Sequence, residues 1–194
     1  MKNEKGEYVH HWKENFKDKE DNDPKKMVRL AQEIADLSSS LPIEPTNAMF
    51  VRADEDRLDV MKAIIFGAEG TPYAHGCFEY DVFCVSGYPE GPPKVNLETT
   101  GNSDVRFNPN LYANGKVCLS LLGTWRGSAS ENWDPKLSNL NQVLMSIQSV
   151  VMSEEVYFNE PGYEHEVGTE LGESKNLAYS NIVRLCNMKH AMVG

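Results

Sequence analysis

The chain has 194 residues and a formal net charge of −10, with 40% hydrophobic and 25% charged residues. This length and composition suit a globular domain with one proper core. So acidic a chain lacks the electrostatic footprint of a protein that binds nucleic acid or anionic membranes non-specifically, and it has no apolar run that could span a bilayer. We therefore expect no nucleic-acid partner and no membrane partner.

The polar first segment, residues 1–22, has Trp12 and Phe16 as its main large apolar side chains. Its composition is typical of a disordered lead. The alternative is a short helix, because residues four apart share a helix face and could pack together on the body. The segment lacks the apolar stretch of a signal peptide, so we expect a cytoplasmic protein, with the nucleus as a further option.

A helix is predicted from Pro24 to about residue 38. Asp23 is an N-cap residue type, and proline is favoured at the first helical position. Apolar residues then recur at helical spacing, at Met27, Leu30, Ile34 and Leu37. Three basic residues would lie on the exposed side of this helix: Lys25, Lys26 and Arg29. We interpret residues 23–192 as one core domain.

Strand-like stretches follow a break at Pro42 and Pro45, and they cover residues 49–52, 58–66, 76–85 and 95–97. Tight turns between consecutive stretches favour an antiparallel meander. A rigid loop with three prolines, residues 88–94, separates the last two stretches.

Residues 106–122, RFNPNLYANGKVCLSLL, hold the most informative pattern. An Asn-Pro-Asn turn is followed by an Asn-Gly turn and then by an apolar run that contains Cys118. Such a loop can fold back and bring the Asn110 amide near the Cys118 sulfur. A thiol beside an N–H donor suggests acyl-thioester chemistry, because the donor can stabilise an oxyanion. The alternative is a buried structural cysteine on a strand.

Two helices are predicted after the cysteine. Residues 138–152 form an amphipathic pattern with Ser138 as the expected N-cap. Its apolar face consists of Leu140, Val143, Leu144, Ile147, Val150 and Val151. Residues 164–174 are polar and predict a loop, and residues 176–192 predict a closing helix. The inward side chains of that helix would be Tyr179, Ile182, Val183, Cys186 and Met188.

The loop at residues 106–122 resembles the active-site loop of ubiquitin-conjugating enzymes. In that family the catalytic cysteine lies eight residues after the Asn of a His-Pro-Asn signature, and Asn110 and Cys118 keep this spacing. Asn108 replaces the signature histidine, which is thought to brace the loop. GAEGTPYAHGCFEYDV, GYPEGPPKV and residues 133–135 are also similar, in family order. The resemblance implies an α+β ubiquitin-conjugating fold: N-terminal helix, four-stranded antiparallel meander, active-site loop and C-terminal helices.

Within the family, the segments MVRLAQE, RFNPNLY, GKVCLSLL and YFNEPGYE are similar to a branch of giant, inhibitor-of-apoptosis-like conjugating enzymes and their large relatives. Members of that branch act as hybrids of conjugating enzyme and ligase. The interval between Cys118 and Trp133 is longer than in most of the family, so residues 123–132 are interpreted as an insertion beside the active site.

The resemblance also implies residue roles. Cys118 would receive ubiquitin from an activating enzyme that uses ATP, Asn110 would donate to the oxyanion or brace the loop, and Glu160 would form the lip of the cysteine channel. The rest of the active-site region would be Asn108, Pro109, Ser120, Tyr157 and Asn159. Donor ubiquitin would contact Met145 and Ser149. The activating enzyme would contact Lys25, Lys26 and Arg29, and ligases would contact Glu90, Asp134, Pro135 and Lys136.

A substrate lysine must be neutral to attack the thioester, and a free lysine has a pKa of about 10.4. A desolvating channel lowers that pKa, whereas the charge of Glu160 raises it, so we interpret Glu160 as a positioning group. Glu90 stands where many family members carry an aromatic anchor for RING ligases, so we expect weak RING binding. The resemblance implies no cofactor in this chain. We expect no metal, because the cysteines lie far apart, at Cys77, Cys84, Cys118 and Cys186.

Two alternatives stay open from the sequence. One is conjugation of another ubiquitin-like modifier, which no single residue excludes. The other is a non-catalytic, ubiquitin-binding variant of the same fold, although such variants usually lack the cysteine. A Cys-His protease is disfavoured because no motif ties a histidine to Cys118. The resemblance implies protein substrates that accept the modifier on a lysine.

Overall fold

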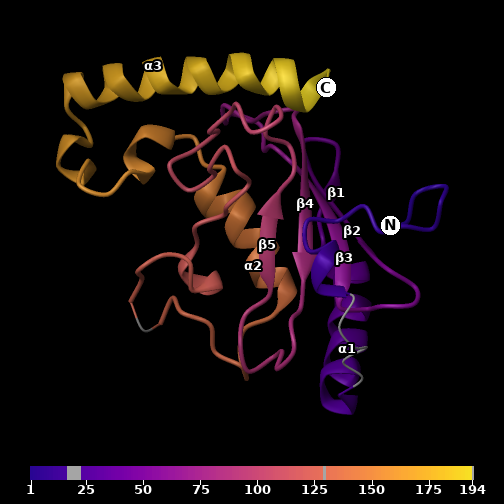
Figure 1. The fold of residues 1–194 in the computed structure, drawn as a ribbon. Helices are drawn as coiled ribbons and strands as arrows, with labels where there is room; N and C mark the ends of the chain where they lie inside the picture. The colour runs from indigo at the N-terminus through magenta and orange to yellow at the C-terminus, as the bar shows by residue number, and fades with distance from the viewer. Residues whose placement is uncertain (17–22, 129, 194) are drawn as a thin grey trace.

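An antiparallel sheet with strands in chain order, β1-β2-β3-β4-β5, forms the centre of the computed structural model, which describes residues 1–16, 23–128 and 130–193 (Figure 1). The strands are β1 (Ile43–Glu44), β2 (Asn47–Ala53), β3 (Val60–Phe66), β4 (Cys77–Phe83) and β5 (Lys94–Leu97). The helices are α1 (Pro24–Ser40), α2 (Leu140–Ser146) and α3 (Glu170–Asn187). The predicted α+β fold is confirmed, and β1 extends the predicted meander by a fifth strand.

The additional strand β1 escaped prediction because it is only two residues long and lies between two prolines. Ile43 pairs with Ala48 and Glu44 pairs with Asn47. Proline is tolerated beside an edge strand, where one side needs no hydrogen bonds. The two prolines therefore flank a short edge strand and do not separate the helix from the sheet.

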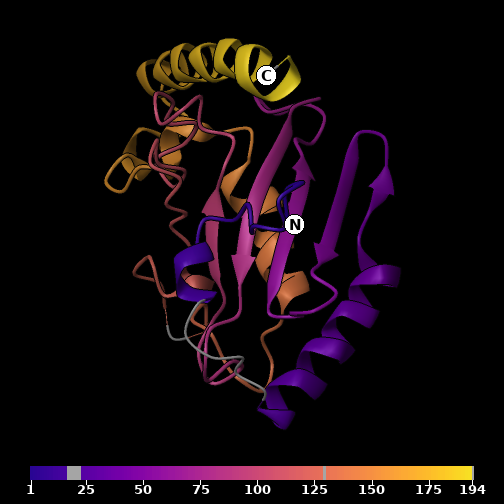
Figure 2. The ribbon, with the colours of Figure 1, turned by 45° about the vertical axis from the view of Figure 1, so that its right-hand side comes forward.

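The two faces of the sheet are covered differently. The inner face packs against α1 and α2 through a buried apolar set: Met61, Ala63, Ile65, Phe78, Tyr80 and Val82. The outer face carries Lys62 opposite Asp81 in the β3–β4 register, joined by an ion pair of 2.7 Å. In Figure 2 the N-terminal segment crosses this outer face, on the side opposite α2.

The N-terminal segment packs on the sheet through rings. Lys13–Phe16 forms one turn of 3-10 helix, and the rings of Trp12 and Phe16 lie 6.3 and 5.2 Å from the ring of Phe83. His10 is buried, with its Nε2 3.1 Å from the carbonyl of Met61. Residues 17–22 of the predicted lead lie outside the described residues.

Helix α1 begins at the predicted cap, where the Asp23 carboxylate accepts from the Lys25 N–H at 3.0 Å. The expected exposure of Lys26 is wrong: its residue is 1% exposed, and its Nζ lies 3.0 Å from the Asp59 carboxylate. Lys26 shares the inward face with Leu30, because residues four apart stack on one side of a helix. The charge is tolerated in this position because it is paired.

The predicted helix over residues 138–152 begins and ends differently. Asn139, not Ser138, caps α2 in a reciprocal capping box with Gln142. A π-helix follows at Ile147–Val151. Because its wider turn rotates each residue less about the axis, Val150 turns outward and is 59% exposed, contrary to the prediction.

Helix α3 begins six residues before the predicted start, since Thr169 caps it by accepting from the Gly172 N–H at 3.1 Å. The two glutamates in its first turn stabilise the helix, because their negative charges lie at the positive end of the helix dipole. Of the predicted inward residues, Val183 is buried, whereas Ile182 and Met188 are 62% and 47% exposed. The helix lies across one end of the sheet (Figure 1).

Candidate active site

The loop before the cysteine is held by its own side chains and by β5. Asn108 Oδ1 accepts from the Asn110 N–H at 2.8 Å, and the Cys118 N–H donates to the Asn110 carbonyl at 2.9 Å. Gly115 has a φ of +86°, and a Cβ there would lie 2.6 Å from the Leu97 carbonyl oxygen. Only glycine fits that close approach, which seats the loop against the sheet.

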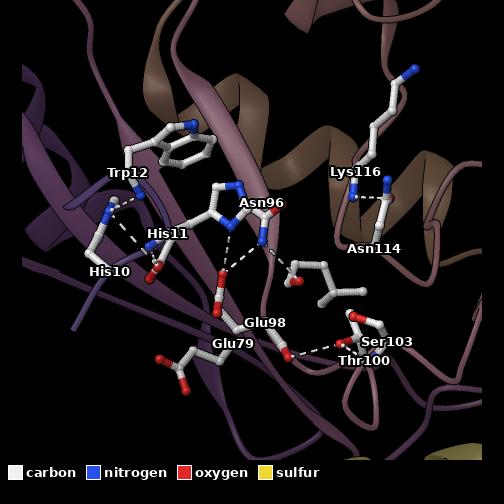
Figure 3. Close-up of polar contacts among 12 residues, drawn as sticks. His10, His11, Trp12, Glu79, Asn96, Glu98, Thr100, Ser103, Asn114 and Lys116 are labelled. Atoms are coloured by element: carbon white, nitrogen blue, oxygen red, sulfur yellow. Dashed lines mark hydrogen bonds and ion pairs between the residues drawn. The ribbon is translucent and has the colours of Figure 1, made fainter. Parts of the chain in front are cut away.

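Figure 3 shows this junction between the sheet and the loop. Asn96, which pairs with Lys116 in an isolated bridge, donates to the Glu98 carboxylate at 2.7 Å. The Asn114 side chain accepts from the Lys116 N–H at 3.1 Å, which closes the turn before the cysteine. His11 of the N-terminal segment lies 3.8 Å from Glu98, on the outer side of the same junction.

Cys118 combines a buried thiol with basic neighbours. The residue is 2% exposed. Burial raises the pKa of the thiol, while Lys116, a hydrogen bond from the Tyr112 side chain, and Arg106 lower it in part. The thiol form therefore predominates in the free protein at neutral pH, and the three neighbours lie where a negative charge on sulfur would be stabilised.

Asn110 lies beside Cys118, as the loop pattern predicts. Its Nδ2 donates to the backbone carbonyl of Cys118 at 2.9 Å. Among the described residues its Oδ1, which is buried, has no hydrogen-bond partner. In this arrangement the amide braces the two ends of the loop. To donate a hydrogen bond to an oxyanion, the Asn110 amide would have to turn away from the Cys118 carbonyl or use its second N–H.

Asn108 does the bracing that the sequence put in question. It is fully buried, and its Nδ2 donates to the Tyr73 hydroxyl at 2.9 Å and to the Val151 carbonyl at 2.7 Å. Its Oδ1 holds the Asn110 N–H and lies 3.5 Å from the Asn159 amide nitrogen. The smaller amide thus links the loop to the core and to the segment after α2, and buried Pro109 follows it.

The lip of the channel contains a residue that sequence reasoning did not select. Glu160 lies next to Arg106, with 3.4 Å between Oε2 and Nη2. The Arg106 guanidinium lies 4.4 Å from the centre of the Tyr112 ring, and its Nη2 donates to the Pro109 carbonyl at 2.7 Å. The sequence signal that could have revealed this residue is the pattern Arg106, Tyr112 and Lys116, which places an aromatic residue between two cations shortly before the cysteine.

Of the remaining predicted site residues, Asn159 contacts the active-site loop region, whereas Tyr157 contacts the segment before α3. The Asn159 amide donates to the Val151 carbonyl at 3.2 Å, beside Asn108. Tyr157 instead stacks on Tyr163, with ring centres 4.5 Å apart, and its hydroxyl donates to Glu166 at 3.3 Å. Tyr157 therefore supports the segment that leads into α3.

A groove of about 800 Å³ runs beside the cysteine. Leu119 and Ser120 line it together with Gln142 and Ser146 of α2. Residues of the predicted insertion also line the groove, and the Ser120 hydroxyl donates to the Glu131 carboxylate at 3.4 Å. On the outer surface of α2 and the following π-helix, Met145 and Ser149 are exposed together with Val150.

The two predicted ligase-contact loops lie against each other. The Trp133 indole donates to the Pro89 carbonyl at 2.7 Å, which joins the proline loop to the residues after the insertion. Glu90, Asp134 and Lys136 are exposed, and Pro135 is half-buried. On α1, Lys25 is exposed, whereas Arg29 is half-buried, pairs with Glu33 and donates to the Ser138 carbonyl at 2.7 Å.

The described residues form neither a membrane-spanning helix nor a metal-ligand cluster. None of the helices there is long and apolar enough to cross a membrane. Within the same residues, no three or more His, Cys, Asp or Glu side chains gather as metal ligands would. All four cysteines are free thiols.

Comparison with known families identifies the class. A family model described as ubiquitin-conjugating enzyme matches residues 29–186, so the chain belongs to the ubiquitin-conjugating enzyme family. Enzymes of this family are transferases that act through a cysteine thioester. The resemblance stated from the loop motif is confirmed, and it extends over most of the chain.

Several relatives are similar over this range. The chain is 53% identical over 165 residues to the human "Dual E2 ubiquitin-conjugating enzyme/E3 ubiquitin-protein ligase BIRC6", covering 85% of this chain and 3% of that protein. It is 51% identical to the Arabidopsis thaliana "Putative ubiquitin-conjugating enzyme E2 38", covering 79% and 45%. For the Caenorhabditis elegans "Probable ubiquitin-conjugating enzyme protein 17" the identity is 45%, covering 84% and 22%. The chain thus spans less than half the length of these relatives.

Proposed function

We propose that Cys118 accepts the ubiquitin C-terminus as a thioester from an activating enzyme, which uses ATP, and that the chain then transfers ubiquitin to a lysine of a protein substrate. The observation that carries the proposal is the loop geometry: a buried thiol with basic neighbours, on a backbone that Asn110 holds and that Asn108 braces through Asn110. Family membership supports it. The chain itself needs no cofactor for this chemistry.

Transfer proceeds by aminolysis. The neutral lysine nitrogen attacks the thioester carbonyl carbon, the C–N bond forms, and the C–S bond breaks with its electron pair passing to sulfur. The lysine has lost one proton to solvent before the attack, and a second proton ends on sulfur because the thiol pKa is raised. Glu160 and the Asn110 amide flank the reacting group as positioning and bracing residues.

A second part of the proposal concerns ligases. The branch resemblance and the printed name of BIRC6, a dual conjugating enzyme and ligase, support direct transfer to substrates without a separate ligase. Exposed Glu90 gives further support, because a carboxylate fills an apolar RING pocket only at a large desolvation cost. We propose that RING ligases bind weakly. Donor ubiquitin would bind the face around Met145 and Ser149, and the activating enzyme would contact the side of α1 that exposes Lys25.

Localisation in the cytoplasm, with access to the nucleus, is part of the same proposal, and the free state of the four cysteines supports it. The alternative function is conjugation of another ubiquitin-like modifier, and the following experiment distinguishes it from conjugation of ubiquitin.

The experiment is a charging assay of the full chain with a panel of activating enzymes, each supplied with its own ubiquitin-like modifier. We expect a reductant-sensitive adduct with ubiquitin and its activating enzyme, and discharge of that adduct by free lysine. If the chain is charged only with another modifier, then that modifier, and not ubiquitin, is the group that the enzyme transfers. Ubiquitin binding without any covalent adduct would instead support a non-catalytic binding variant.

A further inference from the structure

Arg106 joins three parts of the channel mouth. Its Nη2 donates to the Pro109 carbonyl at 2.7 Å, which anchors the side chain to the loop. The same nitrogen lies 3.4 Å from the carboxylate of Glu160, which follows the 3-10 helix Val156–Asn159, and the guanidinium lies 4.4 Å from the centre of the Tyr112 ring. The Tyr112 side chain in turn acts on the Cys118 thiol, whose pKa it lowers. The positive charge is thus fixed between the acidic lip and the cysteine.

This position changes the electrostatics for an incoming lysine. A carboxylate alone at the lip attracts an ammonium group and raises its pKa, which opposes the loss of the proton that the attack requires. A guanidinium beside that carboxylate cancels much of the negative charge while leaving its oxygens available as acceptors. The paired lip can therefore orient an amine without holding it in the charged form.

Other charged or titratable groups also face the mouth. Those contributed by the elements around it include Glu160, Lys116, Tyr112, Cys118 and Tyr179. Burial raises the pKa of Tyr179, so its hydroxyl is neutral over the range in which a lysine would react. The Lys116 Nζ lies 5.6 Å from the centre of the Tyr112 ring and adds to the positive field, and among the described residues it forms no ion pair with Glu160.

We propose that Arg106 is a positioning residue for aminolysis, which fixes the Glu160 carboxylate at the mouth and lowers the pKa of the attacking lysine by neutralising that carboxylate. The inference rests on the proposed conjugating function and assigns a role within it. Guanidinium suits the task because it stays charged at every relevant pH and its planar fork can hold the carbonyl, the carboxylate and the ring together.

The test is single-turnover discharge of pre-charged protein to free lysine, from about pH 6.5 to about pH 9.5. In Arg106→Gln we expect the midpoint of the pH–rate profile to rise by about 0.5 to 1 unit, because a half-exposed charge near the amine is lost. The rate near neutral pH then falls by roughly 3- to 10-fold, and the profiles converge at high pH. Arg106→Lys keeps the charge and should recover most of the shift.

Two further variants protect the test against a folding defect. Glu160→Gln leaves Arg106 in place without the anion, so its midpoint should move below that of the wild type, even though its maximal rate falls. Arg52→Gln removes the same charge from exposed β2 and should leave the midpoint unchanged.

A wild-type midpoint in Arg106→Gln, with a uniform loss of rate at every pH, would overturn the inference, as would an upward shift in Glu160→Gln. Both outcomes presuppose normal charging. Absence of a thioester on the wild-type chain would overturn the proposed function, and this inference with it.

Discussion

Asn108 offers the sharpest test of how this loop is held, because it replaces the family's signature histidine with a smaller side chain. Asn108→Leu removes the amide while keeping the number and branching of the side-chain heavy atoms, so the effect of the lost hydrogen bonds is separated from that of a cavity. Three short bonds disappear, of 2.7, 2.8 and 2.9 Å. The Val151 carbonyl keeps a donor, because Asn159 also donates to it at 3.2 Å.

The expected cost follows from those bonds. A buried hydrogen bond contributes about 0.5–1.5 kcal/mol, and a buried donor left without a partner costs about 1–3 kcal/mol. Since Val151 retains a donor, the main unsatisfied group is the Asn110 N–H. We expect Asn108→Leu to lower the free energy of unfolding by about 3 kcal/mol, or roughly 6–12 °C in melting temperature for a domain of this size.

The assay is denaturant unfolding followed by tryptophan fluorescence, together with the rate of charging. The matched control is Asn181→Leu on the exposed side of α3, which we expect to change stability by less than about 0.5 kcal/mol. Charging of Asn108→Leu should be slower than that of the control under conditions where both are folded. A stability loss below about 1 kcal/mol would refute the bracing role.

Three further predictions address single interactions. Asn110→Ala should lower stability by about 1 kcal/mol with a modest loss of discharge, whereas a loss of about 100- to 1,000-fold at unchanged stability would identify an oxyanion donor. Burial would raise the pKa of Asp59, but hydrogen bonds from Arg57 and Lys26 outweigh it and lower that pKa. The folded pKa lies below the unfolded value of about 3.9, so the ionised carboxylate contributes stability above about pH 4, and this contribution disappears as the pH falls through the folded pKa. Asp59→Asn should therefore be less stable than the wild type above about pH 4, and the difference should vanish at lower pH. Denaturation at a series of pH values measures this, with Asp104→Asn at an exposed position as the control. Glu90→Phe should raise RING affinity in titrations of charged protein without changing discharge in the absence of a ligase, and strong RING stimulation of the wild type would contradict that reasoning.

Local patterns in the sequence were sufficient for most of the fold. The cap at Asp23 and the apolar spacing after it predicted α1, and strand-like stretches between turns predicted β2 to β5. The spacing from Asn110 to Cys118 predicted their proximity, which the structure has. These features depend on neighbours within a few residues, which a periodicity can express.

The misplaced residues depend on contacts that are distant in the sequence. Lys26 was expected at the surface because charge usually indicates exposure, but Asp59, in the turn just before β3, pairs with it. Val150 was misplaced because a π-helix changes the rotation per residue, and nothing in the apolar pattern marks that change. Arg106 was missed because its partner Glu160 is 54 residues away.

The most direct measurement is the site of the ubiquitin adduct. Wild-type protein, Cys118→Ser and Cys118→Ala are each incubated with activating enzyme, ATP and ubiquitin, and the products are compared with and without reductant. We expect a reductant-sensitive adduct on the wild type, a reductant-resistant oxyester on Cys118→Ser and no adduct on Cys118→Ala. Replacement of Cys77 or Cys186 by serine should leave charging intact. A reductant-sensitive adduct that persists in Cys118→Ala would place the nucleophile elsewhere and contradict the assignment of Cys118.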